Sequence, residues 1–344
     1  MQEDQNIAAE GSHIPTPEQE ADLLSDKRVA QISDAQRAAE NILLSSATRE
    51  LQSTIGPLLP TGTIIEHADL LGDEEGWNSK PFRVRIAGKP DHIFLLLKTK
   101  NAPDTVNKLT HLQPLLSEIA ATTPGKLPQI TYSSNTPPVF IGCPALPGRP
   151  LDKIVANLQP NDRSSLVKTM AETLGTIHSV PLEKAKQHDV KEEDLVGKYE
   201  YYFGEDFLSK EIRPVLNAKE YNVLHAYAAR ALQNPDFMNY RPEFVHGDLG
   251  SGNVLFDAAN RSVGIIDWEH ASISDADKDI HNFCRTFPPD LQEAFLQHYP
   301  MRNTTKPREK MIFLDMYRAL ILVSFGDKKG LEDLKEAISK LAPI

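Results

Sequence analysis

One short segment, residues 244–271, constrains the fold of this chain more than any other part of it. Its two apolar runs, 253–257 and 263–267, flank a turn of small and polar residues, a pattern typical of a β-hairpin. Because paired strands lie about 5 Å apart, such a hairpin brings Asn253, at its start, close to Asp267, at its end. The sequence therefore predicts that an amide and a carboxylate side chain meet beside one hairpin.

Around this hairpin the chain changes character near Gly148. Before this residue, runs such as 82–86 and 92–98 have the alternating or continuous apolar pattern of strands, and after it apolar residues recur at helical spacing. We therefore expect an α+β protein. The predicted divisions are a disordered, acidic tail over residues 1–24, an N-terminal nucleotide-binding lobe with a leading helix over 25–147, and a C-terminal catalytic and substrate-binding lobe over 148–344.

Composition excludes several classes of function. The net charge of −11 makes binding to nucleic acid phosphates unfavourable, and it suits a cationic substrate as well as it suits plain solubility. Two cysteines, Cys143 and Cys284, are too few for a disulfide framework. The N-terminus lacks the features of a signal sequence, and the most apolar late stretch is interrupted by Asp315 and Arg318. We expect a cytoplasmic protein without membrane insertion; the sequence indicates no oligomeric state.

The polar residues of the hairpin segment match the needs of phosphoryl transfer. Asn253 follows Asp248 by five positions, the spacing that protein kinases use for a catalytic base and a magnesium ligand. Asp267 lies fourteen positions further on, where a second magnesium ligand is expected. Each residue alone is more often a turn or cap residue. Together they predict a base, Asp248, beside a Mg²⁺ site formed by Asn253 and Asp267.

Longer motifs extend this pattern. HGDLGSGNVLFD (246–257) followed by GIIDWE (264–269) resembles the signature of the aminoglycoside phosphotransferase and choline kinase superfamily. ALPGRPL (145–151), a helix ending in Ile-His at His178, and DADKDIHNF (275–283) resemble further segments of it. The resemblance covers about residues 60–340. It implies a bilobal protein-kinase-like fold, with a small N-terminal lobe containing an antiparallel sheet and a larger, mainly helical C-terminal lobe.

The resemblance also implies roles for individual residues. Asp248 takes the place of the catalytic base, and Asn253 and Asp267 take the places of the magnesium ligands. His246 and Asp279 match residues that support the catalytic loop without taking part in the chemistry.

On the nucleotide side, Lys98 ends an apolar strand at the position where the family has the lysine that contacts the donor phosphates. Lys100 is the alternative candidate for this lysine. Gly76, Asn78 and Ser79 lie between the first two predicted strands, where a loop is expected to cover the phosphates of the nucleotide. The acidic residues of this loop, 73–75, would repel phosphate and must therefore point outward. The donor is ATP or GTP, since recognition of a base by backbone atoms leaves little trace in a sequence.

One departure from the family concerns the helix glutamate that pairs with this lysine. Its expected position falls near Gln113, and Glu118, the only glutamate of that helix, comes about two turns late. Together with the acidic phosphate loop, this departure leaves a catalytically silent nucleotide-binding protein as an alternative to a kinase.

On the acceptor side, Glu200 and Tyr202 belong to an acidic and aromatic stretch that suits a cationic amine, and Glu269 follows a metal ligand closely. The same aromatic residues could instead pack a helix against the core. The expected partner is a small molecule with a hydroxyl group, such as an aminoglycoside. Choline, ethanolamine, another amino alcohol or a sugar are the alternatives.

Overall fold

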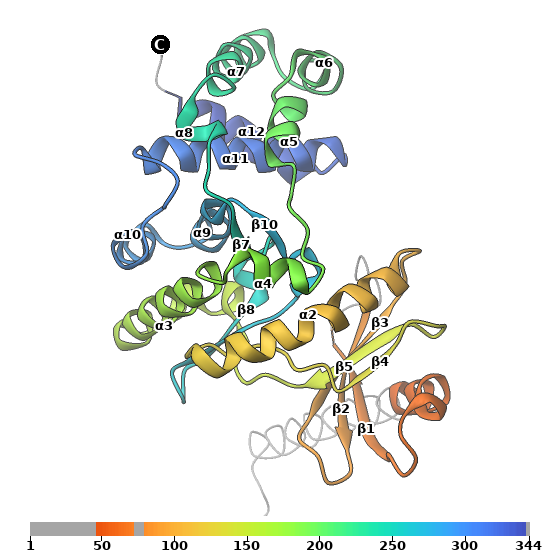
Figure 1. The fold of residues 1–344 in the computed structure, drawn as a ribbon. Coiled ribbons are helices and arrows are strands. Elements are labelled where there is room, and N and C mark those ends of the chain that lie inside the picture. The colour runs from red at the N-terminus through yellow and green to blue at the C-terminus, as the bar shows by residue number, and fades with distance from the viewer. Residues whose placement is uncertain (1–45, 72–78, 342–344) are drawn as a thin grey trace, which may run out of the picture. The chain divides into compact units, whose positions relative to one another are not determined.

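The structure is a computed structural model that describes residues 46–71 and 79–341 (Figure 1). The chain divides between Asp91 and His92 into two compact units. The expected tail over residues 1–24 lies outside the described residues, as does most of the expected leading helix. The lobe boundary expected at residues 147 and 148 stays a prediction.

In the first unit, a helix over residues 46–54 precedes an antiparallel pair of strands. Strand β1 (Ile65–Leu70) pairs with β2 (Ser79–Ile86), and Ala68 lies opposite Val84. The alternation expected of residues 82–86 is present in β2, where Phe82, Val84 and Ile86 are buried. A single 3₁₀ turn, η1 (Gly56–Leu58), separates the helix from β1.

The second unit begins with three antiparallel strands and a long helix. β3 (His92–Leu97) pairs with β5 (Phe140–Pro144), which pairs in turn with β4 (Tyr132–Ser134). Gly142 of β5 faces Phe94 of β3, and any side chain at this position would meet the phenyl ring at 2.6 Å. Helix α2 (Ala102–Thr122) buries an apolar stripe that includes Val106 and Leu112.

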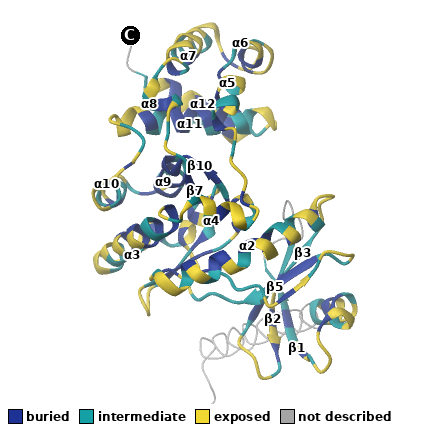
Figure 2. Ribbon diagram, viewed as in Figure 1, coloured by how far each residue is buried: buried dark blue, intermediate teal, exposed yellow. Residues whose placement is uncertain are grey.

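Helices form most of the remaining chain, as the helical spacing predicts. Figure 2 shows that α9 and much of α11 are buried, whereas α3 keeps an exposed face. The helices are α3 (Pro160–His178), α4 (Leu182–Gln187), α5 (Leu195–Tyr202), α6 (Glu205–Phe207), α7 (Ala218–Ala231), α8 (Pro235–Met238), α9 (Ala276–Cys284), α10 (Pro289–His298), α11 (Pro307–Ser324) and α12 (Lys328–Ser339). Antiparallel strands first and helices afterwards confirm the α+β class.

Short turns connect these elements. They are the 3₁₀ turns η2 (Leu151–Lys153), η3 (Val155–Asn157), η5 (Ser251–Asn253) and η6 (Trp268–His270), and the π turn η4 (Leu208–Ile212). Within the described residues, no helix has the length and apolar character that crossing a membrane requires.

Two small sheets inside the helical part position the site. β8 (Val254–Asp257) and β9 (Ser262–Ile265) form the predicted hairpin, and β6 (Arg149–Pro150) pairs with the other edge of β8. Separately, β7 (Glu243–Val245) pairs with β10 (Ser272–Ser274). The chain thus enters the site from β7 and leaves it through β10.

Aromatic rings fill the space between α5, α8 and α11. Phe313 of α11 stacks between Phe203 and Phe237, with ring centroids 4.9 and 4.7 Å away. Tyr199 of α5 meets Phe313 and Tyr317 edge-on at 4.8 and 4.7 Å. These contacts fix α5 and α11 against each other.

A buried ionic network connects the start of α9 to α11. Lys310, fully buried, lies 3.0 Å from the carboxylate of Asp275 and donates a hydrogen bond to the carbonyl oxygen of Phe237. Burial and the nearby Asp275 raise the pKa of Asp277 to about 6. Lys310 is therefore the cation that compensates a buried pair of carboxylates.

Replacing this cation should destabilise the protein. We expect Lys310→Met to lower the free energy of unfolding by about 3–5 kcal/mol, because it leaves buried carboxylates without a counter-charge. Protonation removes that charge, so the deficit should shrink between pH 7 and pH 5, around the raised pKa of Asp277. Urea unfolding at both pH values measures this. Lys306→Met, at the exposed end of the same helix, is the control, and an equal loss in both variants would contradict the assignment.

Candidate active site

A buried carboxylate holds the loop that follows β7. The two oxygens of Asp279 accept hydrogen bonds from the backbone N–H groups of His246, at 2.7 Å, and Gly247, at 2.9 Å. Burial alone would raise the pKa of Asp279, but a hydrogen bond from His178 and the backbone bonds lower it below its usual value. Asp279 therefore remains charged in the core and fixes the loop through these hydrogen bonds.

His246 is also structural by geometry. Its Nε2 lies 2.8 Å from the carbonyl oxygen of Ile266, so Nε2 must carry the proton and donate it. Its Nδ1 then accepts a hydrogen bond from the N–H of Asp248, at 3.2 Å. The ring is completely buried and joins the catalytic loop to the end of the hairpin.

Gly247 allows the loop that follows β7 to pass close to the backbone of His270. Its φ of 87° lies in the left-handed region, and a Cβ atom there would lie 2.2 Å from the carbonyl oxygen of His270. This close approach brings Asp248 next to the segment that follows Asp267. Asp248 itself is exposed.

The hairpin places Asn253 as predicted. Val254 pairs with Ile265, and the residues just beyond this pair, Asn253 and Ile266, continue the pairing. The N–H of Ile266 donates to the carbonyl oxygen of Asn253 at 3.0 Å. The amide nitrogen of Asn253 donates to the carbonyl oxygen of Asp248 at 2.8 Å and lies 3.4 Å from its carboxylate. With its nitrogen engaged, the Asn253 side chain keeps its oxygen for a ligand.

Asp267 has a backbone conformation that non-glycine residues rarely adopt, with φ 68° and ψ 61°. The next residue, Trp268, anchors this turn: its indole is buried, donates to the carbonyl oxygen of Ile265 at 3.0 Å, and meets the ring of His246 edge-on. The turn lies two residues past the end of β9, and it leaves Asp267 exposed.

The charges around Asp267 suit a cation. Desolvation by surrounding protein atoms raises the pKa of Asp267, and the negative charges of Glu269 and Asp248 raise it further. Within the described residues, no three histidine, cysteine or acidic side chains cluster as a metal site. One carboxylate and one amide oxygen nevertheless fit Mg²⁺, which takes few protein ligands and completes its shell with water and phosphate.

The residues expected on the nucleotide side are placed less completely. Lys98 follows directly after β3 and is exposed, and Ser79 begins β2. Gly76 and Asn78 lie outside the described residues. These assignments stay predictions.

Gln113, at the position expected for a helix glutamate, has a structural role. Its Oε1 accepts a hydrogen bond from the N–H of Ile130 at 2.8 Å, and its Nε2 lies 3.2 Å from Gln129. Glu118 forms an ion pair with Lys184 of α4. Both side chains thus connect α2 to other parts of the second unit.

Helix α2 contributes a residue that the sequence gave no reason to select. Lys108 donates from its ammonium group to the carbonyl oxygen of Glu269, at 2.5 Å. Burial lowers the pKa of Lys108, while the charge of Glu269 acts in the opposite direction. Lys108 therefore fixes the turn after Asp267.

A pocket of about 230 Å³ opens beside Asp248. Helices α5, α9 and α11 line it together with the catalytic loop, and its ionisable side chains are Glu193, Lys198, Asp248, Lys278, His281, Tyr317 and Arg318. Sequence reasoning missed this basic set. Its only signal was the helical spacing of Lys278 with His281 and of Tyr317 with Ile321, which shows a shared face but not what that face meets.

None of the three residues expected to contact the acceptor, Glu200, Tyr202 and Glu269, lines this pocket. Glu200 is exposed and lines another hollow, with Glu205 and Lys210. Tyr202 packs edge-on against Phe207 and Tyr317, as a core aromatic does. Glu269 lies on the Asp267 side, 3.4 Å from His270.

Comparisons with known proteins agree with this geometry. The model of the phosphotransferase enzyme family matches residues 69–311. No curated protein sequence matches the chain. A solved structure of the GDP complex of aminoglycoside 2'-phosphotransferase-IIIa is similar with a TM-score of 0.73 and 21% identity, covering 85% of this chain and 98% of that one.

Two further structures have the same fold. Macrolide 2'-phosphotransferase type I gives a TM-score of 0.61 at 19% identity, covering 86% of this chain and 97% of that chain. ADP-bound aminoglycoside phosphotransferase APH(2'')-Ib gives 0.61 at 18% identity, covering 80% and 92%. These similarities confirm the predicted kinase-like fold. With more than half of its length matched by the family model, the chain belongs to the phosphotransferase enzyme family and is a phosphotransferase with an alcohol group as acceptor.

Proposed function

We propose that this protein transfers the γ-phosphoryl group of a nucleoside triphosphate to a hydroxyl group of a small molecule, with Asp248 as the base. The observation that supports the proposal is the local arrangement of three residues. Asn253 contacts Asp248 through its side chain, while its backbone is hydrogen-bonded to Ile266, the residue before Asp267. One hairpin thus brings the backbones of these three residues near one another, and a pocket opens beside Asp248.

The chemistry of Asp248 follows from its position. Its carboxylate is exposed to the pocket and accepts the proton of the acceptor hydroxyl as the hydroxyl oxygen bonds to the γ-phosphorus. The bond between that phosphorus and the β–γ bridging oxygen breaks, and the nucleoside diphosphate leaves with the negative charge. Most of the catalysis in such a reaction is positioning, which the bonds of Asp279 and His246 supply.

Asn253 and Asp267 would hold magnesium on the donor phosphates. When bound, this ion neutralises charge that develops on the phosphate oxygens. Burial first, and then the charges of Glu269 and Asp248, raise the pKa of Asp267. A group of carboxylates of this kind suits a cation.

Lys98 would contact the donor phosphates, with Gly76, Asn78 and Ser79 in the covering loop. One similar structure is a GDP complex and another is ADP-bound. The donor of this protein is therefore ATP or GTP, and assays with both decide between them.

The acceptor is a small molecule that enters the pocket beside Asp248. One similar structure contains kanamycin and another gentamicin, which would agree with the cationic acceptor expected from the sequence. However, the residues behind that expectation do not line this pocket: Glu200 lines another hollow and Tyr202 packs into the core. Amino alcohols and sugars stay possible acceptors on the same grounds.

Removal of the base should abolish most turnover. We expect Asp248→Asn to lower kcat by about 10²–10⁴-fold, because an amide cannot accept the hydroxyl proton, while nucleotide affinity changes little. A coupled assay over a panel of amino alcohols, aminocyclitols and sugars, with ATP and with GTP, measures this. Asp290→Asn, an exposed aspartate in the first turn of α10, is the matched control. Undiminished turnover in Asp248→Asn would refute the assignment.

Removal of a metal ligand should separate nucleotide binding from magnesium. Loss of an outer-shell partner already costs about tenfold to a hundredfold in metal affinity, so Asp267→Asn should weaken the magnesium dependence of ADP binding at least as much. Calorimetric titration with ADP at several magnesium concentrations measures it. Asp257→Asn, at the far end of the same hairpin, provides the comparison. Equal magnesium dependence in both variants and in the unchanged protein would contradict the metal site.

Asp279 should matter for both stability and rate. Asp279→Asn replaces a charged acceptor by an amide that cannot accept both backbone N–H groups, so we expect a loss of about 1–3 kcal/mol in unfolding free energy and a lower kcat. Because the pKa of Asp279 is lowered on folding, the advantage of the aspartate is complete above pH about 4 and shrinks as the pH falls below it. Urea unfolding across this pH range measures the stability, and kcat at pH 7 measures the rate. An unchanged unfolding free energy together with an unchanged kcat would contradict this role of Asp279.

A further inference from the structure

The pocket beside Asp248 is built from two helix faces. On α9, Lys278, His281 and Asn282 line it at helical spacing, and on α11 the residues that do so are Leu314, Tyr317, Arg318 and Ile321. Residues three and four apart share one side of a helix, so each set points into the same space. The pocket is therefore a built feature of the fold and not a gap at the surface.

The cations of this pocket outnumber the carboxylates that serve them. Glu193 binds both Lys198, at 2.8 Å, and Lys278, at 2.6 Å. Burial opposes its ionisation, but the charge of Lys278 and hydrogen bonds from both lysines lower the pKa of Glu193 to about 2. Glu193 is thus fully charged and balances one of the two lysines. With Asp248 as the other carboxylate of the lining, the pocket has three cations, Lys198, Lys278 and Arg318, against two carboxylates.

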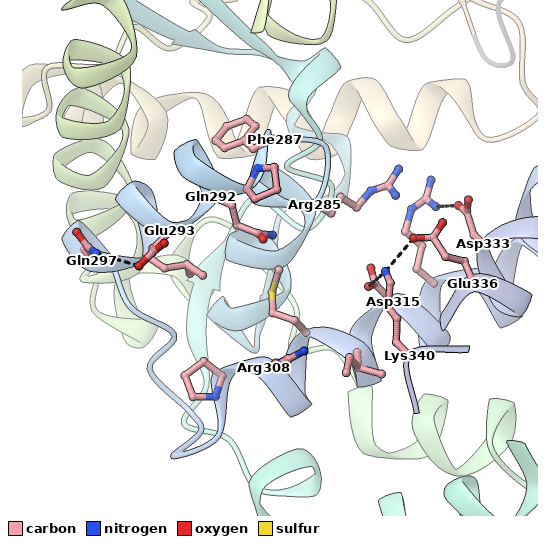
Figure 3. A pocket seen from close by; sticks show the side chains of 16 residues that line it. Arg285, Phe287, Gln292, Glu293, Gln297, Arg308, Asp315, Asp333, Glu336 and Lys340 are labelled. Atoms are coloured by element: carbon pink, nitrogen blue, oxygen red, sulfur yellow. Dashed lines mark hydrogen bonds and ion pairs between the residues drawn. The ribbon is translucent and has the colours of Figure 1, made fainter. Parts of the chain in front are cut away.

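The same imbalance occurs at Arg318. Its guanidinium lies 3.2 Å from Asp333, which also binds Lys329 at 3.1 Å. Arg318 lines both the pocket beside Asp248 and a neighbouring one of about 770 Å³ (Figure 3). Most of its N–H donors remain available, because a guanidinium has five of them.

Arg285 adds a further positive charge nearby. It lines the larger pocket, on the side where Asp333 lies in Figure 3. Among residues 46–71 and 79–341, its guanidinium makes no hydrogen bond or ion pair, although it is half-buried. Burial and the charge of Arg318 lower the pKa of Arg285, whereas the charges of Asp333, Asp315 and Asp248 raise it.

We propose that the acceptor carries an anionic group, a carboxylate or a phosphate, which Lys198, Lys278 and Arg318 bind while its hydroxyl faces Asp248. This inference rests on the proposed function and names the acceptor class for the same site. Charge-assisted hydrogen bonds from lysine and arginine to such groups are strong and specific.

The arrangement disfavours a polycation. Apart from the base, Glu193 is the only carboxylate that lines the described pocket, and it already binds two lysines. An acceptor with several ammonium groups would meet like charges in a partly desolvated space, which is unfavourable. An anion instead completes the coordination of three cations.

Matched acceptors test the charge preference. The protein is assayed with its preferred nucleotide against gluconate and glucitol, glycerate and glycerol, glucose 6-phosphate and glucose, and kanamycin. We expect each anionic member to have a kcat/KM at least about tenfold above its neutral partner, as one charge-assisted hydrogen bond gives. Preference for the carboxylates or for the phosphates distinguishes the two anions. A higher kcat/KM for kanamycin or for the neutral members overturns the proposal.

Variants assign the preference to the pocket. Arg318→Gln and Lys198→Gln should each raise KM for the anionic acceptor by about tenfold or more and leave KM for its neutral partner and for the nucleotide unchanged. Lys329→Gln is the control, since Lys329 binds the same Asp333 but does not line the pocket. Equal effects on charged and neutral acceptors, or equal effects of Lys329→Gln, would contradict the proposal.

A binding measurement keeps the inference separate from turnover. With the nucleotide site saturated by ADP and magnesium, calorimetry compares 6-phosphogluconate with glucitol in the unchanged protein and in Arg318→Gln. Tighter binding of the anion that Arg318→Gln removes supports the proposal even if no acceptor in the panel is phosphorylated. Equal binding of both probes overturns it. Absence of any magnesium-dependent consumption of ATP or GTP would instead count against the proposed function.

Discussion

The site depends on one buried carboxylate. Asp279 is inaccessible to solvent, yet it stays charged because two backbone N–H groups of the catalytic loop and the ring of His178 bind it. A buried charge without hydrogen-bond partners is very unfavourable. If the loop moved away, Asp279 would lose two of its hydrogen bonds, so the loop is held in place. The positions of His246, Gly247 and Asp248 follow from this constraint, and they in turn fix which face of the hairpin the base meets.

The second constraint is electrostatic. Asp248 and Glu269 are charged neighbours of Asp267, and these carboxylates suit a cation. Lys198, Lys278 and Arg318 line the pocket that opens beside the same Asp248. Asp248 therefore has both acidic and basic neighbours. In the proposed reaction, the acidic neighbours would hold the metal ion of the donor, and the cations would hold the acceptor.

The chemistry could be read from the sequence where the determinants are local. The hairpin follows from two apolar runs of fixed length and one turn, and the register of β8 and β9 confirms it. The joint role of Asn253 and Asp267 at a metal stays a prediction. The acceptor side could not be read in this way. Whether Tyr202 faces a ligand or the core depends on its packing against Phe207 and Tyr317, and the latter comes from a helix more than a hundred residues later.

Net charge illustrates the same limit. A formal charge of −11 was compatible with a cationic ligand and with plain solubility, yet folding gathers Lys198, Lys278 and Arg318 around the pocket of about 230 Å³ beside Asp248. Overall charge describes the whole surface, whereas recognition depends on the few charges that lose water together. Glu193 and Asp333 are each shared between two cations, and the pocket lining has three cations against two carboxylates, Glu193 and Asp248. This local balance is the opposite of the acidic balance of the whole chain.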